Sequence, residues 1–250
     1  MALKRPVRKA HVPSGLAKIH KAEESTYCNA LIFAPHGHGK THLLATANED
    51  ERTSPILVLN FEGGTHTLAG SDVDVFDVRT WAEYDEAYEI LSDPNCKYRS
   101  TGLDSISETQ IFGMLNILDK DAKRVDPDLM AQQDWGVILV QMRRLVRHFR
   151  DLPMHVFFTA LAGESVVPRL GTIKVPLLQG AFQKELPGIV DVVAYLANED
   201  ADDDTVHRLL LLHSYPKFQV KARTPWGVRI PTEIEDPSIT DLLDVLGFKS

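Results

Sequence analysis

Short apolar runs alternate with longer amphipathic stretches along most of the chain, beginning at Ala30. Short apolar runs are typical of buried strands, whereas apolar residues spaced three and four positions apart are typical of amphipathic helices. The runs predict strands at 30–34, 56–61, 73–78, 101–103, 155–161, 192–196 and 206–213, with shorter ones at 218–220 and 228–230. The stretches between them predict helices at 40–47, 81–91, 107–118, 135–150, 181–186 and 239–246.

The order of these elements predicts the fold class. Strands alternate with helices over the first two thirds of the chain, which is the pattern of successive βαβ units around a parallel sheet. The consecutive strands after Val192 predict antiparallel additions instead. We therefore expect an α/β fold with a mainly parallel central sheet flanked by helices and antiparallel strands at its C-terminal edge.

Length and local charge predict the domain organisation. A chain of 250 residues with 44% hydrophobic residues is long enough for one well-formed core. Residues 1–21 differ from the rest because they carry six basic residues and no acidic one, and Pro6, Pro13 and Gly15 interrupt them. We expect a basic N-terminal arm at 1–27 and a single domain at 28–250. Whether the arm is a solvated tail or contacts DNA or a neighbouring subunit stays open.

The overall composition excludes several classes. A net charge of -8 argues against a protein that coats nucleic acid by bulk charge. The two cysteines, Cys28 and Cys96, form no CxxC pair, so neither a disulfide framework nor a zinc site is expected. No apolar run is long enough for a secretory signal or a membrane span. We expect no membrane contact and a cytoplasmic location.

The strongest chemical signal is a glycine-rich segment between the first predicted strand and the first predicted helix. It reads Ala34-Pro35-His36-Gly37-His38-Gly39-Lys40-Thr41 and matches GxxxxGK[ST], except that Ala34 replaces the first glycine. Such a loop points backbone N–H groups at phosphate oxygens, its lysine adds a positive charge, and its threonine can bind Mg²⁺. The residues expected to bind a nucleotide are Pro35, His36, Gly37, His38, Gly39, Lys40, Thr41 and His42.

Acidic residues at strand ends are candidates for the chemistry at such a loop. Glu62 follows the second predicted strand, where a carboxylate can orient and deprotonate a water that attacks the γ-phosphate. Two aspartates compete for the role of Mg²⁺ partner. Asp77 follows the more apolar run, whereas Asp104 ends a strand and, with Ser105, opens a helix. We favour Asp104 because a strand end that opens a helix is the usual place for this aspartate.

Together, Ala34–Thr41, Glu62 and Asp104-Ser105 resemble the core of RecA-family ATPases. More closely, the chain resembles phage-encoded RecA-like single-strand annealing proteins, also described as phage AAA-type P-loop nucleotide-binding proteins. The resemblance covers about residues 28–230. Its more specific segments are Phe61-Glu62-Gly63-Gly64, Asp134-Trp135-Gly136, Gln179-Gly180-Ala181-Phe182 and Leu186-Pro187-Gly188-Ile189-Val190-Asp191.

The resemblance implies an ATP hydrolase that requires Mg²⁺ and acts on single-stranded DNA in phage recombination or annealing. It implies that Lys40 binds the phosphates, that Thr41 and Asp104 bind Mg²⁺, and that Glu62 activates the attacking water. It also implies a homo-oligomer, either a ring or a filament, with a single-stranded-DNA-binding protein as a further partner. If the chain is phage-encoded, its location is the cytoplasm of the bacterial host.

Later residues of the family pattern are matched less fully. Lys221-Ala222-Arg223 fits the late-strand element with which RecA-like ATPases reach the γ-phosphate of a neighbouring subunit. The glutamine that senses the γ-phosphate in RecA proteins is replaced here by Thr159-Ala160-Leu161, which leaves Thr159 or Glu164 as candidate sensors.

DNA loops are expected beyond strand ends, at 119–134 and 162–180. The second segment carries Arg169 and Lys174, which we expect to contact single-stranded DNA. The alternative for this segment is a β-hairpin whose basic residues are structural.

Two other functions of the protein also stay open: a non-hydrolysing assembly protein that is gated by a nucleotide, and a P-loop small-molecule kinase.

Overall fold

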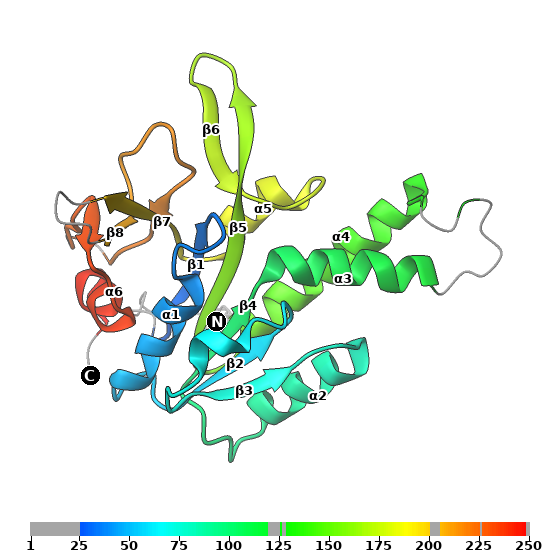
Figure 1. The fold of residues 1–250 in the computed structure, drawn as a ribbon, viewed down its shortest axis with the longest axis horizontal. Helices are drawn as coiled ribbons and strands as arrows, with labels where there is room; N and C mark the ends of the chain where they lie inside the picture. Colours follow the sequence, from blue (N-terminus) through cyan, green and yellow to red (C-terminus); the bar gives the residue numbers. More distant parts are fainter. Residues whose placement is uncertain (1–25, 120–125, 127–128, 201–205, 226, 249–250) are drawn as a thin grey trace, which may run out of the picture.

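A twisted sheet with the strand order β10-β8-β7-β1-β5-β4-β2-β3 runs through the centre of the molecule (Figure 1). The computed structural model describes residues 26–119, 126, 129–200, 206–225 and 227–248. The strands are β1 (Asn29–Ala34), β2 (Ile56–Asn60), β3 (Asp74–Asp77), β4 (Ser100–Asp104), β5 (His155–Val167), β6 (Gly171–Pro176), β7 (Val192–Asp200), β8 (Val206–Leu211), β9 (Lys221–Ala222) and β10 (Glu233–Glu235). Strand β6 pairs with β5, and β9 pairs with β7.

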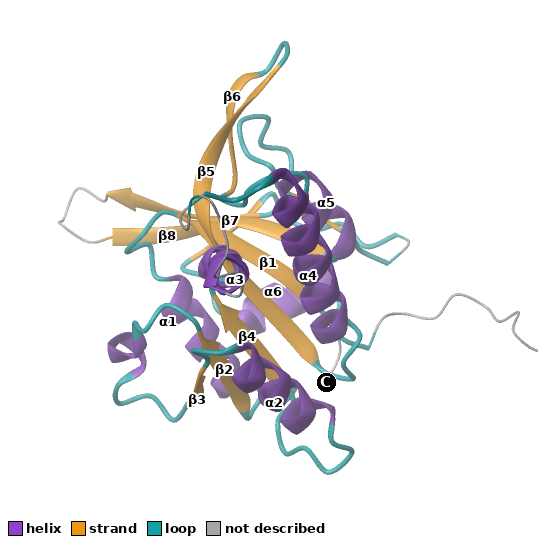
Figure 2. Cartoon of the chain, turned by 90° about the vertical axis from the view of Figure 1, so that its right-hand side faces the viewer, coloured by secondary structure: helices purple, strands orange, loops and turns teal. Residues whose placement is uncertain are grey.

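Helices cover both faces of this sheet (Figure 2). They are α1 (Lys40–Ala45), α2 (Trp81–Ser92), α3 (Ile106–Asp119), α4 (Gln132–Arg150), α5 (Phe182–Ile189) and α6 (Ile239–Leu246). Side chains alternate across a strand, so β1 sends Leu31 and Phe33 into one core and Ala30 and Ile32 into the other. The first core contains residues of α2, α3, α4 and α5, and the second contains residues of α1 and α6.

The predicted fold class is confirmed. Strands β3, β2, β4, β5, β1 and β7 pair in parallel. Strands β8, β9 and β10 are antiparallel additions beyond β7. Because the parallel strands point the same way, the segments that follow β1, β2 and β4 meet at one edge of the sheet. None of the helices in the described ranges is long and apolar enough to cross a lipid bilayer.

Two short strands were predicted wrongly. Residues 218–220 and 228–230 are not strands, and the late strands are β9 and β10 instead. Phe218 makes a single bridge to Lys174, and its ring packs 4.6 Å from the ring of Tyr195. The apolar side chains of 218–220 are therefore explained by packing against the core outside any strand ladder.

The segment 162–180 is also more regular than a loop. Strand β5 continues to Val167, six residues beyond the predicted end, and pairs with β6 as an antiparallel hairpin that projects from the body of the molecule (Figure 1). Arg169 and Gly171 form its turn with positive φ angles of 71° and 77°. The alternative of a β-hairpin is thus what the structure shows for this segment.

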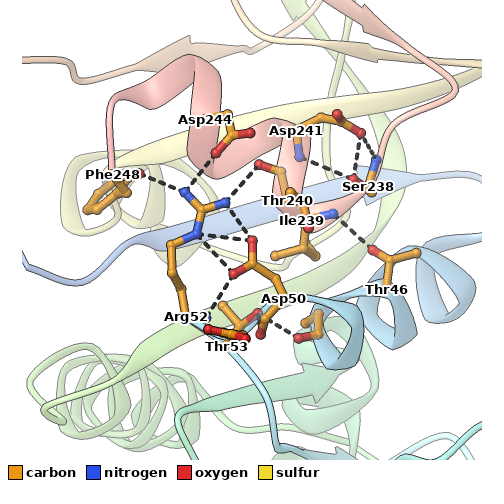
Figure 3. A network of polar contacts seen from close by, with 12 residues as sticks. Thr46, Asp50, Arg52, Thr53, Ser238, Ile239, Thr240, Asp241, Asp244 and Phe248 are labelled. Atoms are coloured by element: carbon orange, nitrogen blue, oxygen red, sulfur yellow. Dashed lines mark hydrogen bonds and ion pairs between the residues drawn. The ribbon is translucent and has the colours of Figure 1, made fainter. Parts of the chain in front are cut away.

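Helix α6 is attached to the segment after α1 by a polar network centred on Arg52 (Figure 3). The Arg52 guanidinium pairs with Asp50 and Asp244 and donates to the carbonyl oxygen of Phe248 at 2.7 Å. Hydrogen bonding to Arg52 lowers the pKa of Asp50 to about 2. This network holds the C-terminal helix against the face of the sheet that also carries α1.

Two sequence predictions lie wholly or partly outside the described residues. The basic arm at 1–27 is described only from residue 26, and the loop at 119–134 only in part. The division into an arm and a single domain therefore stays a prediction.

Candidate nucleotide-binding site

The loop between β1 and α1 has the backbone shape that its glycines permit. Gly37 and Gly39 adopt φ angles of 76° and 88°, in the left-handed region that other residues adopt at a cost. The Lys40 ammonium points back across the loop and donates to the carbonyl oxygens of Ala34 at 3.2 Å and Pro35 at 3.0 Å. The Lys40 side chain therefore folds back over the loop that precedes it.

Lys40 is the electrostatic centre of this loop. Only 8% of its surface is exposed, and this burial lowers its pKa, while the nearby carboxylates of Glu62 and Asp104 act in the opposite direction. The same two carboxylates that sequence analysis singled out are thus close enough to act on the Lys40 charge. The structure brings together the loop, Glu62 and Asp104 as predicted.

Asp104 joins the loop to the centre of the sheet. Its Oδ2 accepts a hydrogen bond of 2.6 Å from the Thr41 hydroxyl, and its Oδ1 accepts one of 2.5 Å from Thr159 on β5. Mg²⁺ in nucleotide sites is usually held by one or two protein oxygens together with substrate phosphates and water. A hydroxyl and a carboxylate in contact beside a phosphate loop match that donor set, so Thr41 and Asp104 fit a magnesium ion.

Glu62 lies next to this pair in a turn that β2 and β4 hold in place. The Phe61 N–H donates to the carbonyl oxygen of Asp104, and the Gly63 N–H donates to the Asn60 side chain, both at 2.9 Å. The Glu62 carboxylate itself accepts a hydrogen bond of 2.5 Å from the Ser105 hydroxyl. Its side chain is exposed, so a water molecule has access to it.

Asp77, the competing aspartate, lies elsewhere. It ends β3 at the edge of the sheet, accepts a hydrogen bond from Asn60 and pairs with Arg79 at 3.6 Å. Because β2 separates β3 from β4, the Asp77 carboxylate does not reach the Thr41 hydroxyl, and Asp104 does. The geometry therefore favours Asp104, the aspartate that sequence analysis preferred.

A cavity of about 260 Å³ opens on the side of the loop that faces β7 and β8. Its lining includes Gly39 and His42 of the loop and α1, Leu196 of β7, Arg208 of β8 and Asp236. The Arg208 guanidinium lies against Gly39, where an added Cβ would be 2.9 Å from its Nε. That Nε is buried and makes no hydrogen bond within the described residues.

Two backbone contacts hold Arg208 at this place. Its N–H donates to Asp236 Oδ1 at 3.0 Å, and its carbonyl oxygen accepts from the Asp236 N–H at 2.7 Å. Arg208 was not predicted from the sequence because no local pattern marks it. Its signal in the sequence is an arginine that directly precedes the apolar run Leu209–Leu211 of a late strand.

A parallel sheet whose central strand enters a glycine-lysine-threonine loop ahead of a helix defines a P-loop nucleotide-binding protein. A sequence model described as an AAA domain matches residues 26–224. The chain belongs to this AAA domain family and is therefore a P-loop ATPase by family. No curated protein matches the chain.

The late basic residues lie away from the phosphate loop of the same chain. Lys221 pairs across from Val193, which is level with Leu31 of β1, three residues before the loop begins. Lys221 Nζ donates to the carbonyl oxygen of Val190 at 2.7 Å, and Arg223 pairs with Asp191 at 3.5 Å. Within the chain the structure therefore does not bring these two cations to Lys40.

One of the two predicted basic residues of the hairpin has its charge balanced by an ion pair. Lys174 forms an ion pair of 2.6 Å with Glu164 on the opposite strand, whereas Arg169 is exposed at the turn. The two candidate γ-phosphate sensors are also engaged, because Thr159 is fully buried and donates to Asp104 while Glu164 holds Lys174.

Proposed function

We propose that the protein is a Mg²⁺-dependent ATP hydrolase that binds single-stranded DNA. One observation carries the catalytic half of this proposal. The dipeptide Asp104-Ser105 contacts Thr41 of the phosphate loop through its first residue and the exposed Glu62 carboxylate through its second. A metal-binding pair and a carboxylate for water activation thus flank the place where a γ-phosphate would lie.

Each residue has a distinct role in this proposal. Lys40 leaves the carbonyl oxygens of Ala34 and Pro35 and binds the phosphates, and backbone N–H groups of the loop donate to the phosphate oxygens. Thr41 and Asp104 would hold Mg²⁺, which would supply positive charge to neutralise the developing charge on the phosphate oxygens. Glu62 orients the attacking water and accepts its proton.

The position of the carboxylates also supports one direction for the bound nucleotide. Asp104 and Glu62 follow β4 and β2, on one side of β1, so the γ-phosphate belongs on that side. The nucleoside then extends toward β7 and β8, where the cavity beside Gly39 is located. We assign this cavity to the nucleoside, with Arg208 beside it.

The β5–β6 hairpin supports the DNA-binding half of the proposal. Its base is attached to the helix that follows Asp104-Ser105, because the Ser107 hydroxyl donates to the carbonyl oxygen of Leu177 at 2.8 Å and accepts from the Leu161 N–H at 3.0 Å. The exposed Arg169 at the turn and Lys174 on β6 are the cations that would contact phosphates of a DNA strand.

Substitutions that remove either a positive or a negative charge from this hairpin test DNA binding. Arg169→Ala and Lys174→Ala should weaken binding of a labelled single-stranded oligonucleotide, whereas Glu164→Gln should strengthen it because Lys174 loses its ion-pair partner. All three effects should diminish at high salt. Arg229→Ala, which removes an exposed arginine outside the hairpin, is the matched control. If the three hairpin variants bind the oligonucleotide as the unaltered protein does, the hairpin is not a DNA contact.

We further propose that the protein works as a homo-oligomer, a ring or a filament, in which Lys221 and Arg223 complete a neighbour's site. Their distance from their own phosphate loop supports action on a neighbour. A mixture of Lys40→Ala protein with Lys221→Ala/Arg223→Ala protein tests this, since the first lacks an intact loop and the second lacks the donated cations. Recovered ATP hydrolysis in the mixture supports the shared site, and no recovery contradicts it.

The biological role we propose is strand annealing or recombination of phage DNA in the cytoplasm of a bacterial host, with a single-stranded-DNA-binding protein as partner. The resemblance of the motifs at 61–64, 104–105 and 179–191 to phage annealing proteins supports it. Complementary oligonucleotides coated with a single-stranded-DNA-binding protein should anneal faster in its presence with ATP. An unchanged annealing rate would contradict this role.

A further inference from the structure

We propose that Ser105 is a positioning residue for Glu62, and this inference rests on the proposed role of Glu62 in activating water. The Ser105 hydroxyl lies 2.5 Å from Glu62 Oε1, although 43 residues separate the two in sequence. Ser105 is fully buried while the Glu62 side chain is exposed. The contact therefore joins the exposed Glu62 side chain to a hydroxyl donor that lies in the core.

The donor is fixed by the first turn of α3. Thr109 donates to the Ser105 carbonyl oxygen twice, from its backbone N–H at 3.0 Å and from its hydroxyl at 2.9 Å. Within the described residues, the Ser105 hydroxyl donates to Glu62 and also lies 3.5 Å from the Glu108 N–H. Few alternative directions are left for this hydroxyl, so it defines one position for the carboxylate.

The turn that carries Glu62 is anchored to the same dipeptide. The Phe61 N–H donates to the Asp104 carbonyl oxygen at 2.9 Å, and the Ser105 hydroxyl then holds the Glu62 side chain. Asp104 also holds Thr41. A shift of this dipeptide would move the metal-binding pair and the water-activating carboxylate together, which keeps one geometry between them.

An exposed glutamate without this contact would sample several rotamers, and only some would place an oxygen on the attacking water. Ser105 leaves Oε2 free while it engages Oε1, so one oxygen is oriented and the other accepts the proton of water. Loss of the hydroxyl should therefore lower kcat and leave nucleotide binding unaffected, because Ser105 does not belong to the phosphate loop.

Ser105→Ala is the direct test, with Ser100→Ala as its matched control. Ser100 is equally buried at the start of β4, the strand that Ser105 follows, and its hydroxyl donates to the Thr53 carbonyl oxygen at 2.6 Å. We expect Ser105→Ala to lower kcat for ATP by about tenfold with KM and the Kd for Mg²⁺-ATP within about twofold of the unaltered protein. Ser100→Ala should leave kcat unchanged.

A double-mutant cycle separates a positioning role from a structural one. In a Glu62→Gln background, Ser105→Ala should have no further effect on the residual rate, because it acts through Glu62. The proposal is overturned if kcat of Ser105→Ala is unchanged or raised, or if the two substitutions lower the rate independently. If Glu62→Gln alone hydrolyses ATP normally, the proposed function of Glu62 has failed, which is a different result.

Discussion

The Thr159 hydroxyl donates to Asp104 Oδ1 at 2.5 Å, from a strand that lies between the phosphate-loop strand and the strand that Asp104 ends. The other oxygen of Asp104 holds Thr41. Both carboxylate oxygens are thus oriented, one by the core of the sheet and one by the loop. Thr159 therefore orients Asp104, the aspartate that we propose to bind Mg²⁺, and its burial argues against direct contact with a phosphate.

Thr159→Val should weaken the response to Mg²⁺ while it preserves the fold, because valine has nearly the same shape but donates no hydrogen bond. Loss of a residue that orients a metal ligand commonly costs about tenfold or more in metal affinity or activity. We expect the Mg²⁺ concentration for half-maximal ATP hydrolysis to rise about tenfold. Thr101→Val, whose hydroxyl bonds the Leu57 carbonyl oxygen on β2, is the control. An unchanged Mg²⁺ titration for Thr159→Val would contradict the assigned role.

Arg208→Ala should weaken the binding of ATP and ADP by about tenfold, since the arginine lines the cavity assigned to the nucleoside. Inorganic tripolyphosphate has no nucleoside, so its ability to compete for the phosphate loop should not change. Arg229→Ala again serves as a control at an exposed arginine. If tripolyphosphate binding falls as much as ATP binding, or if neither falls, the assignment of this cavity is wrong.

His155 should make stability depend on pH. It lies in the core at the start of β5, where its Nδ1 accepts a hydrogen bond of 3.1 Å from the Cys28 N–H. Burial, followed by the positive charge of Arg52, lowers its pKa from 6.5 to about 4. The unfolded chain therefore binds more protons than the folded one between these values, so this stability is complete above pH 6.5 and is lost as pH falls toward 4.

This loss can be isolated with His155→Gln, whose side-chain oxygen can still accept from Cys28. Between about pH 7 and pH 5, the free energy of unfolding of the unaltered protein should fall by about 2 kcal/mol more than that of the variant. Urea denaturation at the two pH values measures this difference. Equal losses in both proteins would show that folding does not lower the pKa of His155.

The parts of the site that local patterns define could be predicted from the sequence. The phosphate loop and Glu62 each follow an apolar run, Asp104 ends a strand that opens a helix, and a parallel sheet brings such strand ends to one edge. The central helices and strands were predictable for the same reason, because their apolar periodicity is regular. Helix α6 was predicted with its observed bounds of Ile239–Leu246.

The remaining features depend on contacts between residues far apart in the chain. Arg208 meets Gly39 only because β7 and β8 carry it past the end of β1, where Asn198 is its partner and Leu196 lines the same cavity. The contact between Ser105 and Glu62 depends likewise on the pairing of β2 with β4. The extension of β5 was missed because the residues beyond Leu161 lose the apolar run of a buried strand once the hairpin leaves the core.

Hydrolysis of ATP by Glu62→Gln protein tests the central claim most directly. Glutamine keeps the shape of the side chain but cannot accept the proton of water, so the substitution separates chemistry from binding. We expect the rate of ATP hydrolysis, with and without single-stranded DNA, to fall by about 100-fold or more while the Kd for Mg²⁺-ATP changes by less than about threefold. A Glu62→Gln protein that binds Mg²⁺-ATP and hydrolyses it at the rate of the unaltered protein would contradict the account.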